Sequence, residues 1–537
     1  MDRARLGTQG GGRVTVRAAA ATAALCAVLV GTACTAGKDA PPAGLGRPVH
    51  RGPVRALSAS PDGAWLAFLD GCADVRGQAL PPQTASCDLR VVAAAGGAVR
   101  RIASAVTTMP QAISWTPSGG LVALASYEVP TASGALVAWD GGEPRTLAGG
   151  GVTFYGVGPH GEVGWVERGR LRVLLPGEPA AREVAGADAV ASFDVSPAPP
   201  GDCRPGGPAR LFARRTYSAG GELLAVGCDL GEARPFEKGQ VGEYGFSRAA
   251  GTFAYTVQRR EGAELKLVAA GAAPATIGHG AQTFAFSPDG RALAFVADVV
   301  PGKQGNLHLA ASGRPAALLA REVGELRWAA SAPRLAWLER YDPRVRAGTL
   351  GAGGPGLAPR TYAQNVSDFD MTPDGQHLAF LQHTTRGGYS VDLALAHLSA
   401  PPDAKPEAIA QGVFGFAFSP DGAWLYYRTR CVRNAEACDL ERVPSSGRAP
   451  GAAPERIAEG VKSFEFDPRD PGRLLVTWQR KDMVALDVAV WERGKLTGVD
   501  TAVLPGSARF LGPDSRRIAY VVAAPKRQGV YVAEVPR

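Results

Sequence analysis

Residues 56–68 read ALSASPDGAWLAF, and this stretch decides the fold. Alternating apolar residues lie on both sides of a Ser-Pro-Asp-Gly sequence at 60–63. Proline presets φ at the second position of such a turn, aspartate suits the third, and glycine accepts the left-handed conformation that closes the hairpin. The stretch therefore predicts two antiparallel strands joined by a tight turn.

The same hairpin recurs about every 40 to 57 residues along the chain. Its clearest further copies run from Phe284 to Phe295, from Phe369 to Phe380 and from Phe414 to Tyr427, and weaker copies bring the total to about eleven. The turn residues with an expected structural role are Asp62, Gly63, Asp289, Gly290, Asp374, Gly375, Asp421 and Gly422. Because the aspartates recur at one turn position, we expect them to serve the backbone and not catalysis.

Each hairpin is followed by two more strand-like segments, such as residues 89–92 and 99–102 after the first copy. The four segments predict a four-stranded antiparallel sheet of about 44 residues that is apolar on both faces. Such sheets bury their faces by stacking radially as the blades of a β-propeller. About eleven four-stranded blades exceed the roughly four to eight of an ordinary ring, so the sequence predicts an all-β fold with two tandem propellers, residues 49–280 and 281–537.

The two ends of the chain predict how the fold closes. The last strand-like segment, residues 530–533, is a third strand without a fourth, while residues 47–50 lie where fourth strands lie in other copies. We therefore expect the N-terminal strand to complete the last blade, because this avoids a free sheet edge.

The repeat resembles that of the TolB-like branch of WD-repeat-related propellers, a branch also seen in tricorn and in dipeptidyl peptidases. The resemblance covers residues 50–537 and depends on the turn together with the following Leu-Ala-Phe strand at 66–68, 293–295 and 378–380. It implies a propeller fold but no single activity. TolB also has a small α/β domain before its propeller. We expect none here, so the role of TolB in the Tol-Pal system is not carried over.

The first 33 residues predict a signal peptide, because four arginines precede an uncharged apolar stretch from Ala18 to Val30. That stretch is shorter than the roughly 20 residues that span a membrane. Residues 31–34 read GTAC and resemble a bacterial lipobox, which implies lipidation of Cys34. Gly31 stands where Leu, Val or Ile is usual, so ordinary secretion is the alternative. With residues 34–48 as a flexible tether, we expect an exported protein that its lipid anchors to the cell envelope.

Eight cysteines divide into two in the first 34 residues and six beyond them. The six form the close pairs Cys72/Cys87, Cys203/Cys228 and Cys431/Cys438, and the second member of each pair begins a Cys-Asp-Leu sequence. Local pairs in an exported chain predict disulfides, here at one structural position used three times. Neither the spacing nor nearby histidines provide the four ligands of a zinc site.

The formal charge of +8 falls to about +5 once residues 1–33 are removed. Arginine far outnumbers lysine, and no run of basic residues stands out. A nucleic-acid partner is therefore not expected.

No motif indicates a familiar catalytic centre. The sequence has no Gly-x-Ser-x-Gly elbow, which argues against a hydrolase of the dipeptidyl peptidase type. His377 and His397 are equally far from Gly387, so a hairpin centred there would place them opposite each other. Two histidines on one blade are only weak candidates for metal ligands, and we expect no cofactor and no catalytic residue.

Two classes of function fit these features. A noncatalytic module would bind an envelope protein, a peptide or a glycan at its channel mouth or loops, while its N-terminal lipid contacts the membrane. An enzyme, such as a metal-assisted lyase or lactonase, would instead gather residues from several blades. The binding module is favoured because catalytic motifs are lacking.

Overall fold

The computed structural model describes residues 46–74, 85–109, 112–128, 131–197, 210–247, 252–268, 272–299, 304–311, 316–383, 391–401, 403–432, 437–449, 452–479 and 485–535. Strands make up nearly all regular structure in these ranges, and the helical structure there is one 3-10 turn, η2 (Tyr217–Ala219). The protein is therefore all-β, as the repeat predicts.

The chain divides into two compact units, which are described separately. Of the described residues, unit 1 holds those within 325–353 and 358–501, and unit 2 holds those within 46–324, 354–357 and 502–537.

The strands of unit 2 are β1 (Arg47–Arg51), β2 (Val54–Ala59), β3 (Trp65–Asp74), β4 (Ala85–Ala93), β5 (Arg100–Thr107), β6 (Ile113–Trp115), β7 (Leu121–Glu128), β8 (Ser133–Trp139), β9 (Arg145–Val157), β10 (Val163–Glu167), β11 (Arg170–Leu174), β12 (Arg182–Glu183), β13 (Val190–Val195), β14 (Leu211–Arg215), β15 (Leu223–Val226), β16 (Ala233–Glu237), β17 (Val241–Phe246), β18 (Phe253–Arg259), β19 (Gly262–Val268), β20 (Ala275–His279), β21 (Thr283–Phe286), β22 (Ala292–Ala297), β23 (Asn306–Ala311), β24 (Ala317–Ala320), β40 (Arg509–Leu511), β41 (Arg517–Val522) and β42 (Gly529–Glu534).

The strands of unit 1 are β25 (Glu325–Trp328), β26 (Leu335–Asp342), β27 (Ala347–Gly354), β28 (Leu357–Met371), β29 (His377–His383), β30 (Val391–His397), β31 (Glu407–Ala410), β32 (Gly415–Phe418), β33 (Trp424–Thr429), β34 (Cys438–Pro444), β35 (Glu455–Val461), β36 (Ser463–Phe466), β37 (Arg473–Gln479), β38 (Leu486–Glu492) and β39 (Lys495–Val503). A few terminal residues of β27, β28 and β39 fall within the ranges of unit 2.

The strands form antiparallel meanders in chain order, as the blades of a β-propeller do. Five four-stranded sheets are separate, namely β2–β5, β13–β16, β17–β20, β21–β24 and β32–β35. Elsewhere one long strand serves two meanders. β9 pairs with both β8 and β10, and β28 lies between β27 and β29, so each becomes part of a seven-stranded sheet.

The prediction of about eleven separate blades in two tandem propellers is therefore not supported. The physical reason lies in the outermost strands, since β9 runs for 13 residues and β28 for 15 without a break. The turn motif locates the first two strands of each meander, but it contains no information on whether a fourth strand stops before the next meander begins.

Sheets within each unit bury their faces against the next sheet along the chain. In unit 2, Leu89 of β4 shares one apolar cluster with Leu121 of β7. In unit 1, Tyr426 and Tyr427 point to opposite faces of β33, yet both are fully buried, because one packs with β37 and the other with β29 and β30. That sheet is covered on both sides, as radial stacking requires.

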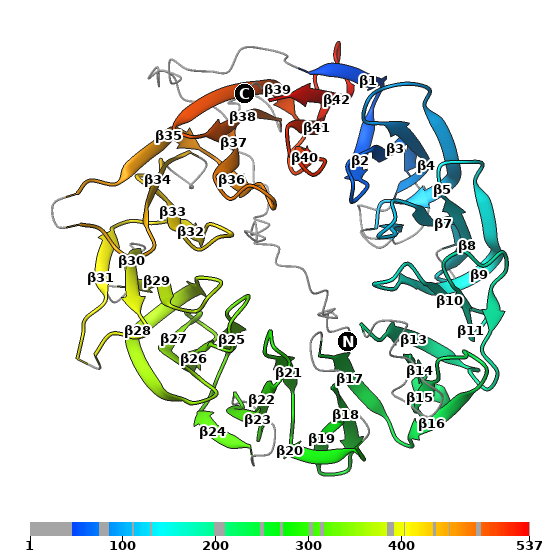
Figure 1. The fold of residues 1–537 in the computed structure, drawn as a ribbon, viewed down its shortest axis with the longest axis horizontal. Helices are drawn as coiled ribbons and strands as arrows, with labels where there is room; N and C mark the ends of the chain where they lie inside the picture. Colours follow the sequence, from blue (N-terminus) through cyan, green and yellow to red (C-terminus); the bar gives the residue numbers. More distant parts are fainter. Residues whose placement is uncertain are drawn as a thin grey trace. The chain divides into compact units, whose positions relative to one another are not determined.

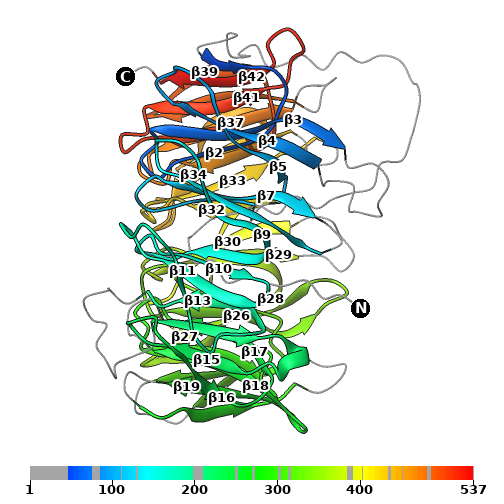
Figure 2. The same ribbon diagram turned by 90° about the vertical axis from the view of Figure 1, so that its right-hand side faces the viewer.

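The N-terminal strand β1 completes the last sheet of unit 2. It pairs antiparallel with β42, with Arg47 opposite Val532 and Arg51 opposite Gly529. Figure 1 shows blue β1 beside red β42, and Figure 2 shows the same pair from the side. The predicted closure is confirmed, and β42 is left without a free edge.

Residues 1–45 lie outside the described residues, so the signal peptide, the lipidation of Cys34 and the tether stay predictions. Within the described part of the chain, no helix has the length and apolar character needed to cross a membrane.

Candidate functional site

Every sheet has two ends with different connections. We call the end with the connections between first and second and between third and fourth strands the turn end. The opposite end, which joins second to third strands and one sheet to the next, is the loop end. The repeat motif itself lies at the turn end, so the two ends differ in chemistry.

At the turn end, the Ser-Pro-Asp-Gly turns satisfy their own polar groups. The Ser287 hydroxyl donates to Asp289 Oδ1 over 2.6 Å and accepts the Ala292 N–H over 3.0 Å. Asp289 Oδ1 also accepts the Arg291 N–H over 3.1 Å. Equivalent bonds stabilise the turns that begin at residues 60, 372 and 419. These turns leave few polar groups for a ligand.

Hydrogen bonding also lowers the pKa of the turn aspartates. The Ser60 hydroxyl, followed by the Ala64 N–H, holds the pKa of Asp62 below its usual value. The Ser287 hydroxyl does the same for the pKa of Asp289. A carboxylate held in its charged form by backbone and hydroxyl donors serves the turn and is poorly suited to proton transfer.

The loop end, in contrast, exposes large apolar side chains. Seven large hydrophobic residues of the described chain are exposed, and six of them lie on connections at the loop end: Met109, Tyr217, Val299, Val345, Phe414 and Val432. The seventh, Leu318, lies on the outer strand β24. Both units follow this distribution. In each unit by itself, the loop end of the sheets is therefore the candidate binding face, because it exposes large apolar side chains.

Disulfides reinforce two loops of this face. The predicted pairs Cys72–Cys87 and Cys431–Cys438 are confirmed, and each closes a connection between a second and a third strand. Cys228 is also disulfide-bonded, but its predicted partner Cys203 lies outside the described residues.

The expectation that all three pairs use one structural position is wrong for Cys228. Cys87 and Cys438 lie at the start of third strands, at the loop end, whereas Cys228 follows the third strand β15 at the turn end. Here the Cys-Asp-Leu sequence forms a turn, in which the Asp229 carboxylate accepts the Gly231 N–H. The same tripeptide therefore serves two different local structures.

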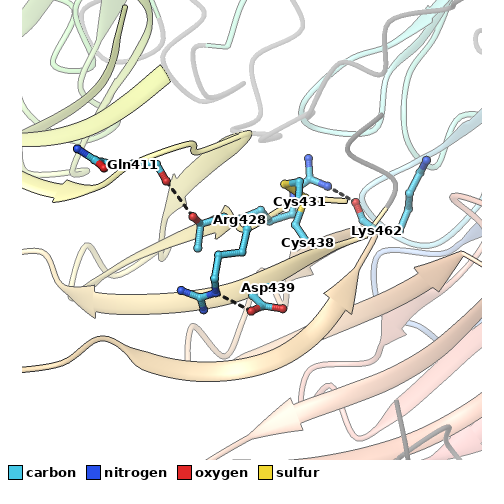
Figure 3. The surroundings of a disulfide bond; sticks show 8 residues. Gln411, Arg428, Cys431, Cys438, Asp439 and Lys462 are labelled. Carbon is cyan, nitrogen blue, oxygen red and sulfur yellow. Dashed lines mark hydrogen bonds and ion pairs between the residues drawn. A yellow bond between two sulfur atoms is a disulfide. The ribbon is translucent and has the colours of Figure 1, made fainter. Parts of the chain in front are cut away.

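The disulfide Cys431–Cys438 lies beside a cationic site (Figure 3). The Arg428 guanidinium donates to the Lys462 carbonyl oxygen, and the Phe414 ring centroid lies 5.5 Å from the guanidinium carbon. Arg428 is only 6% exposed, whereas Phe414 is 60% exposed. An exposed ring therefore covers a buried cation at the loop end of the sheet β32–β35.

This site continues toward the neighbouring sheet β36–β39. The Lys462 N–H donates to Thr477 O over 2.7 Å. The adjacent Trp478 donates its indole N–H to Glu459 O over 2.8 Å. Val432 follows Cys431 in the disulfide-closed connection between β33 and β34, at the loop end of unit 1, and is exposed. Arg428, Lys462, Phe414, Val432 and Trp478 form what we call the Arg428 site.

Three carboxyl groups on first strands, whose pKa values desolvation raises, form a second group of interest. Burial raises the pKa of Asp194 on β13 and of Glu243 on β17 in unit 2. In unit 1, burial raises the pKa of Asp370 on β28 to about 6, although Arg327 on β25 opposes the shift. Arg327 itself donates to Asp368 Oδ1 over 3.0 Å. Shifted carboxyl groups of this kind are typical of functional sites and also of structural ion pairs.

The two candidate histidines face each other as the sequence predicts. His377 on β29 is the register partner of His397 on β30, and their ring centroids lie 4.6 Å apart. Desolvation, followed by the proximity of His397, lowers the pKa of His377. Within the described residues, no three or more His, Cys, Asp or Glu side chains are grouped to hold a metal ion. The pair therefore stays a weak metal candidate.

Comparison of the sequence with known protein families finds no match, and comparison with curated proteins finds none either. Solved structures with a similar fold include a eukaryotic initiation factor, with 13% identity, a TM-score of 0.39, and coverage of 65% of this chain and 87% of that one. The Dos1 propeller has 9% identity, a TM-score of 0.36, and coverage of 68% and 98%. An oligogalacturonate lyase in complex with manganese has 13% identity, a TM-score of 0.30, and coverage of 61% and 96%. These scores are low, so the propeller assignment rests on the sheets of this chain.

The sequence alone did not single out Arg428, Lys462 or Phe414. The repeat predicts Phe414 as the first apolar strand residue of its copy, but the residue precedes β32 and is exposed. A position-by-position comparison of the repeat copies would have separated these residues from their equivalents.

Proposed function

We propose that the protein is an exported, lipid-anchored propeller of the TolB-like type that acts as a noncatalytic binding module in the bacterial cell envelope. Its binding face is the loop end of the sheets, and its partner is an envelope protein, a peptide or a glycan. Lipidation of Cys34 would anchor the protein to a membrane surface, with the N-terminal segment as a tether.

Two features support an exported location. The disulfides Cys72–Cys87 and Cys431–Cys438 suit an oxidising compartment. The arginine-rich start, the short apolar stretch and the small residues before Cys34 fit a leader that is removed during export.

One observation carries the proposed binding role, namely the one-sided distribution of exposed apolar side chains. Folding gains nothing from placing Val345, Phe414 and Val432 in water at 64%, 60% and 62% exposure. Covering them with a partner would bury apolar surface worth roughly 25 cal/mol per Å² before the costs of association. The turn end of the described sheets offers no comparable apolar surface.

Affinity capture from envelope extracts tests this proposal. The wild-type protein is compared with the triple variant Val345→Ser, Phe414→Ser, Val432→Ser. The variant Leu318→Ser is the matched control, because it removes an exposed apolar side chain away from the loop end. We expect the triple variant to lose a partner that both wild type and control retain, and the purified partner to bind with at least tenfold lower affinity.

Equal capture by all three proteins would refute the loop end as the binding face. Recovery of the unprocessed chain from the cytoplasm would refute the proposed location. Circular dichroism of each variant must match the wild type, so that a loss of binding is not a loss of fold.

An enzyme is the second candidate function, and one observation favours it. The pKa of Asp370 near 6 would allow a carboxyl group on a first strand to exchange protons near neutral pH. A screen of lactone and uronate-containing substrates with the wild type and Asp370→Asn tests this role. Turnover that the substitution abolishes would establish an enzyme, and the absence of turnover with every substrate would leave the binding role.

A further inference from the structure

Arg428 occupies a position that holds an aliphatic residue in the other clear copies of the repeat. In the strand pairings Arg428 lies opposite Gly415, and the equivalent pairs are Leu69 with Ala56, Val296 with Thr283, and Leu381 with Asp368. The exposed fractions of Leu69, Val296 and Leu381 are 1%, 4% and 8%, and that of Arg428 is 6%. A guanidinium group therefore replaces a buried aliphatic side chain in this clear copy. The weaker copy at Ser196 also has an arginine at this position, because Arg214 lies opposite Ser192 and donates to the Val241 and Gly242 carbonyl oxygens.

The charge of Arg428 has no carboxylate partner among the described residues. Its contacts are the Lys462 carbonyl oxygen and the Phe414 ring. Burial alone lowers the pKa of Arg428, although an arginine stays protonated at neutral pH. A buried cation without a counter-charge is unfavourable, so its presence calls for a reason other than folding.

Arg473 shows what a structural buried arginine looks like in the same unit. It is 1% exposed, and its guanidinium lies within 3.2 Å of carboxylate oxygens of Asp467, Asp470 and Glu492. Three carboxylates thus neutralise Arg473, whereas none of the described carboxylates neutralises Arg428.

At the position of Phe414, in contrast, an apolar residue replaces a polar one. Five residues before the Ser or Thr of the turn, the other three clear copies have the polar residues Arg55, Gln282 and Ser367. This copy has Phe414, which is 60% exposed. This copy therefore has an apolar side chain, Phe414, at the surface and a cation, Arg428, buried beneath it.

Lys462 supplies a second cation on the residue whose carbonyl oxygen accepts from Arg428. No hydrogen bond or ion pair is found between its ammonium group and another described residue. The nearby Val432 and Trp478 add exposed and half-buried apolar surface. The site therefore combines two cations that have no described carboxylate partner with exposed apolar side chains.

We propose that Arg428 and Lys462 bind a carboxylate of an extended polypeptide segment, while Phe414 and Val432 contact the apolar side chains next to that carboxylate. This inference rests on the proposed binding function and names the chemistry of its partner. The ligand supplies the counter-charge that the described chain lacks at Arg428. Guanidinium and carboxylate groups form paired, charge-assisted hydrogen bonds, which suits such recognition.

A peptide fits the site better than a glycan does. Sugar hydroxyl groups need several side-chain donors and acceptors, whereas the polar side chains of this site are two cations. Valine and an edge-exposed phenylalanine suit aliphatic and aromatic side chains. Val432 and Phe414 lie on two neighbouring connections of one sheet, so a short extended segment can contact both.

Selection of random twelve-residue peptides displayed on phage tests the inference on the whole protein. We expect the enriched peptides to share an Asp, a Glu or a free C-terminus next to apolar residues. Fluorescence polarisation of synthetic copies should show at least a tenfold loss of affinity when Asp and Glu become Asn and Gln. A glucuronic acid oligosaccharide serves as the glycan probe.

The protein variants give an independent check. Lys462→Glu should lower the affinity for the acidic peptides at least tenfold. Lys495→Glu is the control, because it makes the same charge change on an exposed residue at the turn end of unit 1. Arg428→Leu restores the residue type of the equivalent copies. It should abolish acidic peptide binding while the melting temperature stays equal or rises, a combination that a structural arginine would not give.

Several outcomes would overturn the inference. They are enrichment of no peptide, enrichment of peptides without carboxylates, equal binding by Lys462→Glu, and tight binding of the oligosaccharide in place of peptides. Peptides that are sensitive to Val345→Ser but not to Lys462→Glu would leave the binding role of the loop end intact and refute only the Arg428 site.

Discussion

The buried ion network of Arg473 allows the sharpest test of the fold. The substitution Arg473→Leu removes a cation that lies 3.2 Å from Asp467 Oδ2 and 3.0 Å from Glu492 Oε1. Asp467 is completely buried and Glu492 is 16% exposed at its side chain. Leaving such carboxylates without their partner costs about 3 to 5 kcal/mol of unfolding free energy.

Guanidinium denaturation followed by tryptophan fluorescence measures this loss, because Trp424, Trp478 and Trp491 lie in the cluster between β33 and β37. The double variant Arg473→Leu, Asp467→Asn should recover part of the lost stability, since it removes one of the stranded charges. Unchanged denaturation of Arg473→Leu, or a double variant no more stable than the single one, would refute the reasoning.

Three further predictions follow from local structure. Replacing both Cys431 and Cys438 by Ala should lower the free energy of unfolding by about 2 kcal/mol. Reductant should then lower the melting temperature of this variant less than that of the wild type, and an unchanged denaturation midpoint would contradict the prediction. Gly63→Ala should destabilise more than Gly177→Ala, because both glycines have positive φ but only at Gly63 would a Cβ lie 2.0 Å from a backbone nitrogen; equal melting temperatures would argue against the close approach. The folded pKa of Asp370, about 6, exceeds the free value of about 3.9, so stability should fall as pH rises from about 4 to 6, and Asp370→Asn should flatten this profile; parallel profiles would exclude the shift.

The features that local rules determine could be predicted from the sequence. The turn from Ser287 to Gly290 needs only the intrinsic preferences of its four residues, and the structure shows the hairpin that these preferences favour. The facing of His377 and His397 needs only the period of a hairpin. The pairing of β1 with β42 follows from counting strands and from the cost of a free edge.

Features that depend on contacts between distant residues were beyond the same rules. The continuity of β9 concerns an outer strand, and the turn motif contains no information on the outer strands. The Cys-Asp-Leu sequence at Cys228 is identical to the other two, yet its position after β15 changes its role.

The repeat supplies the comparison that separates stability from function in this chain. Equivalent positions share one packing environment, so a residue that departs from its equivalents must be explained by its own surroundings. Asp467 stands where the four clear copies have Ser or Thr in the turn, and Arg473 explains it, because the two form a buried ion pair. Arg428 stands where the other three clear copies have Leu or Val, and no described carboxylate explains it.

We therefore expect substitution by leucine to have opposite effects on stability at Arg473 and at Arg428. Leucine at position 473 strands carboxylates and destabilises unit 1, whereas leucine at position 428 removes an unneutralised charge and restores the side chain that equivalent positions use. If both substitutions destabilise equally, Arg428 is a structural residue and the proposed carboxylate site loses its basis. If only Arg473→Leu destabilises, the fold does not require the charge of Arg428, and a partner is the remaining physical reason for it.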